Sequence, residues 1–333
     1  MRSATLIGIV VAVAMTACSG DEARSAVETH TSGTAAPTTI VTVPPTASVQ
    51  PTLTTAPTTS ITTVPTTTTS APVTVLIGAG DIANATDDDM ATAHLIEAYP
   101  DAVVFTTGDN AYPSGTAQEF SKFYEPTWGA FKDRTKPTVG NHDAQTARAD
   151  GYFEYFGAMA GTPGQGWYSY DLGPWHIIDL NSECGGDGFT SCDEQTRWLG
   201  ADLAATSAEC MIALWHKPLF NAGRHHGEDS FADEWSVLDE AGVDVVLNGH
   251  DHNYQRFTPQ DASGSATSSG MREFVVGTGG APTYEQTSSP ANLDEFYEGH
   301  GVLKLDLEAG GYAWSFISTE GDYGDSGTGS CVA

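Results

Sequence analysis

The stretch Ala102-Val103-Val104-Phe105-Thr106-Thr107-Gly108-Asp109-Asn110-Ala111-Tyr112 allows the first prediction of the fold. Its first four residues form a short apolar run, rich in β-branched and aromatic side chains, that is typical of a buried strand. Gly108-Asp109 then delivers a carboxylate at the carboxyl end of that strand, where ligands bind in open α/β sheets. The stretch therefore predicts an α/β fold with Asp109 at a binding site. An isolated Gly-Asp pair is also common turn chemistry, which is the alternative interpretation.

Four more polar clusters follow apolar runs that we predict to be strands. The clusters are Gly80-Asp81, Gly140-Asn141-His142-Asp143, His216 and Gly249-His250-Asp251-His252. The runs before them are residues 73–77, 135–139, 211–214 and 243–247. Carboxylates, imidazoles, an amide and a phenol are ligands of hard and borderline metal ions. Each cluster alone could be a surface turn, but their shared position after strands favours convergence on one metal site.

The remaining periodicity completes an alternating α/β pattern. Helices are predicted over residues 87–98, 116–131, 196–205 and 231–240, and strands over 167–171, 176–180, 274–276 and a hairpin at 302–317. Thr116 with Glu119 and Ser191 with Glu194 have the spacing of capping boxes, which close the first turn of a helix. The aromatic residues at 152–156 and 167–170 are expected in the core.

Residues 1–20 are predicted to be an export signal. Arg2 precedes an apolar run, residues 6–13, that is too short to cross a bilayer. Met15-Thr16-Ala17-Cys18 resembles a bacterial lipobox, so we expect a lipid anchor at Cys18; ordinary cleavage near Ala17 is the alternative. Both place the mature protein outside the cytoplasm, either anchored at the cell surface or secreted.

Residues 21–72 are predicted to be a disordered linker. Of the 43 residues from 30 to 72, 17 are Thr and 7 are Pro, and none is charged or aromatic. Such a segment cannot bury enough apolar surface to offset its ordering entropy. Residues 73–333 remain as one folded domain.

Net charge and cysteine content indicate which partners suit this chain and whether its cysteines form disulfides. The chain has 43 acidic and 13 basic residues and a net charge of −30, which disfavours nucleic acid as a partner. Besides Cys18, four cysteines remain, and an even number in an exported protein favours disulfides over metal ligation. We expect Cys184–Cys192 to close a short loop and Cys210–Cys331 to tie a core strand to the C-terminal tail.

The five clusters in this order resemble those of the calcineurin-like metallophosphoesterases and, within them, the purple acid phosphatases. The superfamily usually begins with Asp-x-His, whereas this chain has Asp81-Ile82-Ala83. The purple acid phosphatases also lack that histidine and use the tyrosine of Gly-Asp-x-x-Tyr, which matches Gly108 to Tyr112. The resemblance implies a four-layer α/β/β/α sandwich of two mixed sheets with the site at one end.

The resemblance also implies a role for each site residue. One metal ion would be held by Asp81, Asp109, Tyr112 and His252. The second would be held by Asp109, Asn141, His216 and His250, with Asp109 bridging both. The catalytic residues would be His142, His225 and His226, the last two matching the family's spacing of nine and ten residues after the fourth cluster.

The activity implied is hydrolysis of small phosphate monoesters by in-line attack of a metal-bound hydroxide. Three anionic ligands against iron(III) and a divalent ion would leave a net charge of about +2, enough to attract a phosphate dianion. A pair of Fe(III) with Zn, Mn or Fe(II) is therefore expected. Two alternatives stay open: a phosphodiesterase or nucleotidase on the same metals, and a non-catalytic, stalked surface-binding lipoprotein.

Overall fold

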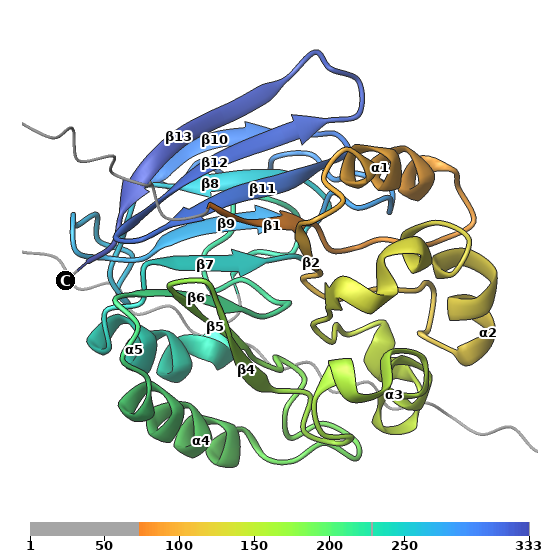
Figure 1. Cartoon of the computed structure of the whole chain (residues 1–333), viewed down its shortest axis with the longest axis horizontal. Helices are drawn as coiled ribbons and strands as arrows, with labels where there is room; N and C mark the ends of the chain where they lie inside the picture. The colour runs from red at the N-terminus through yellow and green to blue at the C-terminus, as the bar shows by residue number, and fades with distance from the viewer. Residues whose placement is uncertain (1–72, 228, 333) are drawn as a thin grey trace, which may run out of the picture. The chain divides into compact units, whose positions relative to one another are not determined.

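Two β-sheets stack on one another in the computed structural model, which describes residues 73–227 and 229–332 (Figure 1). Both sheets are mixed, and helices flank them, so the expected fold class is confirmed. The predicted export signal at 1–20, the lipid anchor at Cys18 and the linker at 21–72 lie outside the described residues.

The six-stranded sheet has the order β13-β12-β11-β1-β2-β3. Its strands are β1 (Thr74–Gly78), β2 (Val103–Phe105), β3 (Thr135–Lys136), β11 (Gly301–Glu308), β12 (Gly311–Ser318) and β13 (Gly324–Ser330). Strands β1, β2 and β3 run parallel, and β11, β12 and β13 continue the sheet in antiparallel pairs. The first three polar clusters therefore follow the carboxyl ends of neighbouring parallel strands and lie at the same edge of the sheet.

The seven-stranded sheet has the order β10-β8-β9-β7-β6-β5-β4. Its strands are β4 (Tyr168–Leu172), β5 (Trp175–Asp179), β6 (Cys210–Leu214), β7 (Val245–Asn248), β8 (Tyr254–Phe257), β9 (Arg272–Val276) and β10 (Leu293–Tyr297). Strands β5, β6, β7 and β9 are parallel, and every residue of β5, β6 and β7 is buried. Continuous apolar runs suit such strands because both of their faces are covered.

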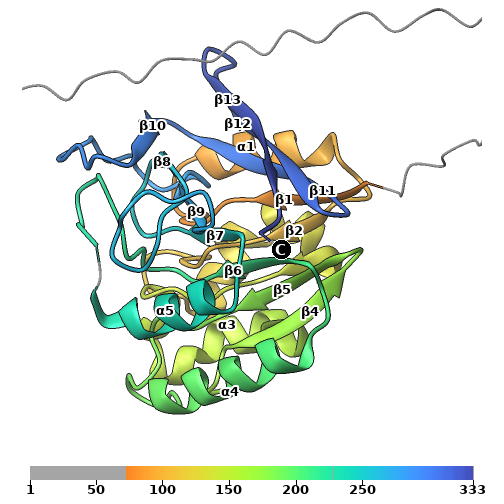
Figure 2. The ribbon, with the colours of Figure 1, turned by 90° about the vertical axis from the view of Figure 1, so that its left-hand side faces the viewer.

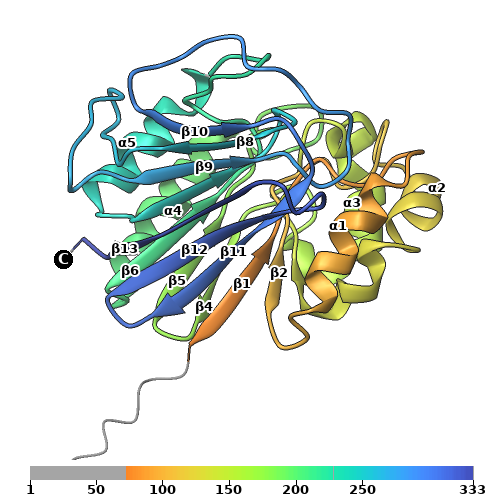
Figure 3. The same cartoon turned by 90° about the horizontal axis from the view of Figure 1, so that it is seen from above.

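The helices divide into two groups. Figure 2 shows α4 (Cys192–Ala205) and α5 (Ala232–Glu240) against the outer face of the seven-stranded sheet, where Trp235 and Leu238 join Leu199 in a buried cluster. Figure 3 shows α1 (Asp88–Glu97), α2 (Ala117–Glu119) and α3 (Asp150–Phe156) gathered on the side of β1 and β2. The aromatic residues of 152–156 and Trp167 are mostly buried, as expected, whereas Tyr168 and Tyr170 are only half-buried.

The predicted helix from Thr116 towards residue 131 is confirmed only at its start. The Thr116–Glu119 capping box forms, but the α-helix covers Ala117–Glu119 and changes to a π-helix over Phe120–Tyr124. A 3₁₀ helix, Trp128–Arg134, follows a break. Pro126 accounts for that break, because a proline has no N–H and its ring clashes with the preceding turn.

Two other local predictions are wrong in part. Helix α4 begins at Cys192, and the Ser191 side chain makes no capping bond, so the second capping box is absent. Strand β3 ends at Lys136 instead of residue 139, because Pro137 cannot donate to a ladder. Strands β8, β10 and β13 were not predicted; β13 has the sequence Gly-Asp-Ser-Gly-Thr-Gly-Ser, which carries no apolar alternation.

Both predicted disulfides are present. Cys184 bonds to Cys192, and Cys210 at the start of β6 bonds to Cys331 beyond β13. Among residues 73–227 and 229–332, none of the helices has the length and apolar content needed to cross a membrane.

His176 on β5 is buried and forms ion pairs with two aspartates outside the polar clusters, Asp202 and the largely exposed Asp171. Its Nδ1 lies 2.8 Å from Asp171 Oδ1 and its Nε2 lies 2.9 Å from Asp202 Oδ2. Burial alone would lower the pKa of His176, but the hydrogen bonds and charges of Asp171 and Asp202 outweigh it and raise the pKa above 6.5. The protonated imidazole therefore stabilises the folded state.

This network predicts a pH dependence of stability. Because the folded-state pKa of His176 is raised, its contribution is complete below pH 6.5 and is lost as the pH rises through the folded-state pKa. The difference in unfolding free energy between the wild type and His176→Gln should therefore shrink as the pH rises above 6.5. Denaturant unfolding across pH 5.5–9 measures it, with exposed His94→Gln as control. A difference that grows with pH would contradict the assignment.

Candidate metal centre

The loops after the parallel strands adopt a strained backbone at three candidate ligands. Asp81, Asp109 and His250 have φ values of 59°, 53° and 70°, in the left-handed region that side chains other than glycine rarely occupy. Backbone hydrogen bonds hold the first two loops together, with Asp81 N–H donating to Gly108 O at 2.9 Å. Such strain persists only where surrounding contacts fix it, which is a feature of functional sites.

Two glycines allow these loops to pack closely. A Cβ at Gly140 would lie 2.2 Å from Asp109 Oδ1, and one at Gly249 would lie 2.6 Å from Asp81 Oδ2. Both contacts are too short for any side chain. The glycines in the third and fifth clusters therefore bring neighbouring backbone up to the carboxylates.

Asp109 lies at the middle of the site and is 1% exposed. Its Oδ2 lies 3.3 Å from His216 Nε2 and 3.2 Å from Tyr112 Oη, and its Oδ1 accepts the N–H of His142 at 2.7 Å. Asn141 Oδ1 lies 3.1 Å from the same His216 Nε2. The second, third and fourth clusters therefore meet around one carboxylate.

Asp81 brings the first and fifth clusters to the same place. It is fully buried; its Oδ1 lies 2.9 Å from Tyr112 Oη and 3.3 Å from His252 Nε2. Its Oδ2 accepts the N–H of His250 at 2.9 Å. Tyr112 Oη is also 3.1 Å from His252 Nε2, so it contacts both carboxylates and one imidazole.

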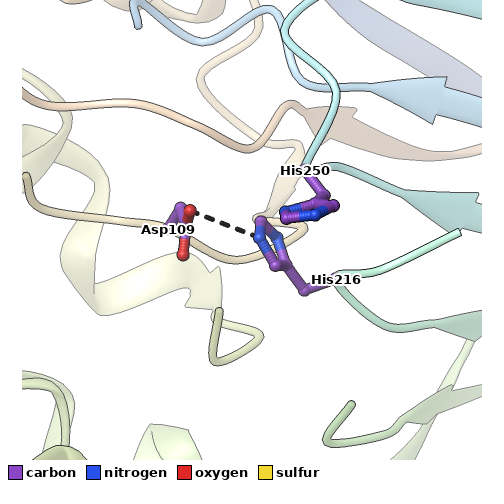
Figure 4. A group of neighbouring side chains, drawn as sticks. All are labelled: Asp109, His216 and His250. Carbon is purple, nitrogen blue, oxygen red and sulfur yellow. Dashed lines mark ion pairs between the residues drawn. The ribbon is translucent and has the colours of Figure 1, made fainter. Parts of the chain in front are cut away.

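Figure 4 shows Asp109, His216 and His250 facing one another from three different loops. One ligand atom from each lies within 4.8 Å of the others, close enough for a common metal ion. The rings of His216 and His250 meet edge to face with centroids 5.0 Å apart. The seven predicted ligands are thus brought together, three of them in a group compact enough for one ion.

Three of the histidines are oriented by backbone carbonyls. Nδ1 of His216 bonds to Thr107 O at 2.7 Å, that of His252 to Pro282 O at 2.7 Å, and that of His142 to Pro113 O at 2.6 Å. A carbonyl only accepts, so each Nδ1 carries a hydrogen and Nε2 is the nitrogen left for a ligand. This is the arrangement in which proteins hold metal-binding imidazoles.

The protonation of the site is set by burial and by charge pairing. Burial alone would raise the pKa of Asp109, but His216 and His142 outweigh it and lower that pKa. Burial would lower the pKa of His216, but Asp109 raises it to about 10. Burial and the neighbouring His216 lower the pKa of His250 to about 2, which keeps it neutral. Burial and the charges of Asp109 and Asp81 raise the pKa of Tyr112 well above 10.

These residues fit a metal centre chemically. Buried carboxylates, imidazoles, an amide oxygen and a phenol are packed within hydrogen-bond distance, and the His216 proton balances the charge of Asp109. A cation would take the place of that proton, because metal ligands bind in their deprotonated forms. Asp109, in contact with Tyr112 on one side and His216 on the other, could contact two ions.

Two of the three predicted catalytic residues, His142 and His225, lie beside this centre. The His142 side chain is 31% exposed, and its Nε2 is 3.9 Å from Asp109 Oδ2. The His225 side chain is 34% exposed and stacks on His250 with ring centroids 4.2 Å apart. His226 follows in the same exposed loop, and its carbonyl accepts a bond from Asn221 Nδ2 at 3.1 Å. His142 and His225 therefore contact the predicted ligands directly.

Three neighbouring residues were not assigned a role from the sequence. Asp143 is fully buried and accepts the N–H groups of Asn110 and Gly140, which ties the second cluster to the third. Asp251 is also fully buried. Tyr284 stacks on His252 with centroids 4.0 Å apart. Asp143 and Asp251 stand next to predicted site residues in the third and fifth clusters, and that position is the sequence signal that points to them. No sequence pattern indicates Tyr284.

Comparison with known proteins agrees with this geometry. Residues 75–254 match the family model described as Calcineurin-like phosphoesterase. The chain belongs to the calcineurin-like phosphoesterase family. All seven candidate ligands lie within the matched residues.

Purple acid phosphatases are among the relatives of this calcineurin-like phosphoesterase. Purple acid phosphatase 18 of Arabidopsis thaliana is 26% identical over 70% of this chain and 57% of its own length. Acid phosphatase type 7 of Mus musculus is 27% identical over 47% of this chain and 41% of its own. The chain therefore spans about half the length of the curated relatives it matches.

A solved structure shares the fold. The purple acid phosphatase from yellow lupin (Lupinus luteus) seeds superposes with a TM-score of 0.64 at 18% identity, covering 78% of this chain and 54% of the other. At that identity the likeness establishes the fold alone.

Replacing Asp109 tests its predicted role as the carboxylate that bridges two metal ions. Asp109→Asn keeps the shape of the side chain but loses the anion that contacts both halves of the site, so both ions should bind more weakly. Metal analysis after dialysis should fall from about two ions per chain to less than one. Asp244→Asn, which alters a buried carboxylate at the other end of β7, should keep two. An Asp109→Asn protein that retains two ions would refute a bridging role.

Proposed function

We propose that this chain is a metal-dependent phosphoester hydrolase that cleaves small phosphate monoesters. The main support for this proposal is the position of Asp109, whose Oδ2 lies 3.2 Å from Tyr112 Oη and 3.3 Å from His216 Nε2. Those two neighbours belong to different ligand sets, so a carboxylate between them suits a two-metal site. Such sites are used to activate water and to bind phosphate oxygens.

The contacts support the two ligand sets that the resemblance implies. Asp81, Asp109, Tyr112 and His252 would hold one ion, and Asp109, Asn141, His216 and His250 the other. The set with the phenol suits Fe(III), and the other suits Zn, Mn or Fe(II). When bound, the ions would lower the pKa of a water molecule and bind the phosphate.

His142 is the residue best placed to protonate the leaving oxygen. Its Nδ1–H is held by Pro113 O, so Nε2 is the nitrogen that gives and takes a proton. A proton from Nε2 to the departing oxygen would prevent a buildup of alkoxide charge in the transition state.

His225 and His226 would stabilise charge on the phosphate. They are adjacent in one exposed loop, and the His225 ring stacks on His250. Their imidazoles would offer hydrogen-bond donors to the equatorial oxygens of the phosphate. His226 is the second choice for protonating the leaving oxygen.

The proposed setting is extracytoplasmic. The two disulfides support an oxidising compartment, and the export signal at 1–20 with a lipid anchor at Cys18 would place the domain at the cell surface on the linker at 21–72. The net charge of −30 favours small phosphorylated substrates over nucleic acid.

The leaving group provides the sharpest test of this function. The full chain should hydrolyse both 4-nitrophenyl phosphate and an alkyl phosphate, and cleave bis(4-nitrophenyl) phosphate more slowly. His142→Gln should lower kcat about 10²-fold or more for the alkyl phosphate and far less for 4-nitrophenyl phosphate, because nitrophenolate leaves without a proton.

Faster cleavage of the diester would favour a phosphodiesterase, and no cleavage of any ester by metal-loaded protein would favour a non-catalytic binding protein. An equal loss on both monoesters would refute protonation by His142.

Tyr112 should give the protein a colour. A phenolate bound to Fe(III) transfers charge to the metal and absorbs visible light, whereas zinc and manganese(II) sites do not. Tyr112→Phe removes the phenol with little change in volume, so the fold should survive while the visible absorption disappears. Absorption spectra of the wild type and the variant, each with its metal content, measure this effect. A colourless wild type holding only divalent ions would refute the Fe(III)–phenolate part.

A further inference from the structure

We propose that Asp251 is a positioning residue that holds the loop from Asn221 to His226 and, through it, the catalytic imidazole of His225. This inference rests on the proposed function for the role of His225. Asp251 stands between two predicted metal ligands in Gly249-His250-Asp251-His252, yet its side chain bonds to the separate loop 221–226.

Each oxygen of the Asp251 carboxylate faces two donors of that loop. Oδ1 accepts the N–H of Arg224 at 3.0 Å and lies 3.5 Å from His225 Nδ1. Oδ2 accepts the N–H of His225 at 3.2 Å and a bond from Asn221 Nδ2. The carboxylate is 0% exposed, so water does not compete for these donors.

The loop is shaped to close over this carboxylate. A Cβ at Gly223 would lie 2.7 Å from Asp251 Oδ2, so only glycine allows the backbone to approach. Asn221 Oδ1 accepts the N–H of Gly223 at 2.8 Å and a bond from Gln255 Nε2 at 2.7 Å. The base of the loop is thereby fixed to β8 as well as to Asp251.

The consequence for His225 is a fixed ring next to the metal centre. The ring stacks on His250 with centroids 4.2 Å apart and planes 27° apart, and its Nδ1 faces Asp251. Nε2 therefore remains for a phosphate oxygen. An aspartate that orients a catalytic imidazole in this way acts through the imidazole and does not touch the substrate.

A matched pair of variants separates this role from simple filling of the core. Asp251→Asn replaces one carboxylate oxygen by an NH2 group, which is itself a donor. Whichever way the amide is oriented, this group faces two of the four donors of the loop, so the loop contacts weaken. Asp244→Asn is the control, because Asp244 is 3% exposed and accepts the N–H groups of Met211 at 2.8 Å and Val332 at 2.6 Å, away from the site.

Hydrogen exchange tests the loop contacts without reference to catalysis. The amides of Arg224 and His225 donate to Asp251, so a peptide covering 221–227 should exchange at least about ten-fold faster in Asp251→Asn than in wild type. Asp244→Asn should leave that peptide unchanged. Unchanged exchange in Asp251→Asn would overturn the proposal.

A double-mutant cycle tests the link to His225. Asp251→Asn should lower kcat/KM for 4-nitrophenyl phosphate about ten-fold in the wild type but less than about two-fold in His225→Gln, because it acts through that ring. Equal losses in both backgrounds would show a merely structural role. If Asp251→Asn does not fold, Gly223→Ala, which displaces the same carboxylate from the loop side, replaces it in both experiments with the same expectations.

These outcomes also separate this inference from the proposed function. Faster exchange together with no hydrolysis by the metal-loaded wild type would retain the loop contacts and refute the phosphatase. Hydrolysis together with unchanged exchange would retain the phosphatase and refute the role of Asp251.

Discussion

The burial of two carboxylates, Asp81 and Asp109, is the constraint on which the rest of the site depends. Each is at most 1% exposed, and an ionised carboxylate in such a place is costly unless it is paired. Tyr112 Oη and the histidine nitrogens provide that pairing, and the raised pKa of His216 reports the demand for positive charge. The same negative charge would attract a metal ion, which binds these ligands in their deprotonated forms.

The topology explains how these groups come together. Clusters one to three follow β1, β2 and β3 of one sheet, and clusters four and five follow β6 and β7 of the other. Gly249 N–H donates to His216 O within the second group, and His250 N–H donates to Asp81 Oδ2 between the groups. Two sheets that meet at their carboxyl edges can therefore supply a bridging carboxylate from one and imidazoles from the other.

The parts that were predictable from the sequence are those with a local cause. Apolar runs ending in polar residues located Asp109 and His250, and Pro-free buried runs such as β7 were recognised by composition alone. The Asp251 contacts, the stacking of Tyr284 on His252 and the carbonyl of Pro282 depend on segments distant in the chain, so no local pattern indicates them. Strand β13 forms by pairing with the edge of β12. The glycine-rich sequence of β13 does not indicate this pairing. Pro126 and Pro137 are the sequence signals for the break after Tyr124 and for the early end of β3.

Anomalous diffraction from crystals of the metal-loaded full chain tests the central claim most directly. The account predicts two ions about 3.5–4 Å apart. Asp109 should contact both, with Tyr112 and His252 on one ion and His216 and His250 on the other. A single ion, or two ions of which neither contacts Asp109, would contradict it.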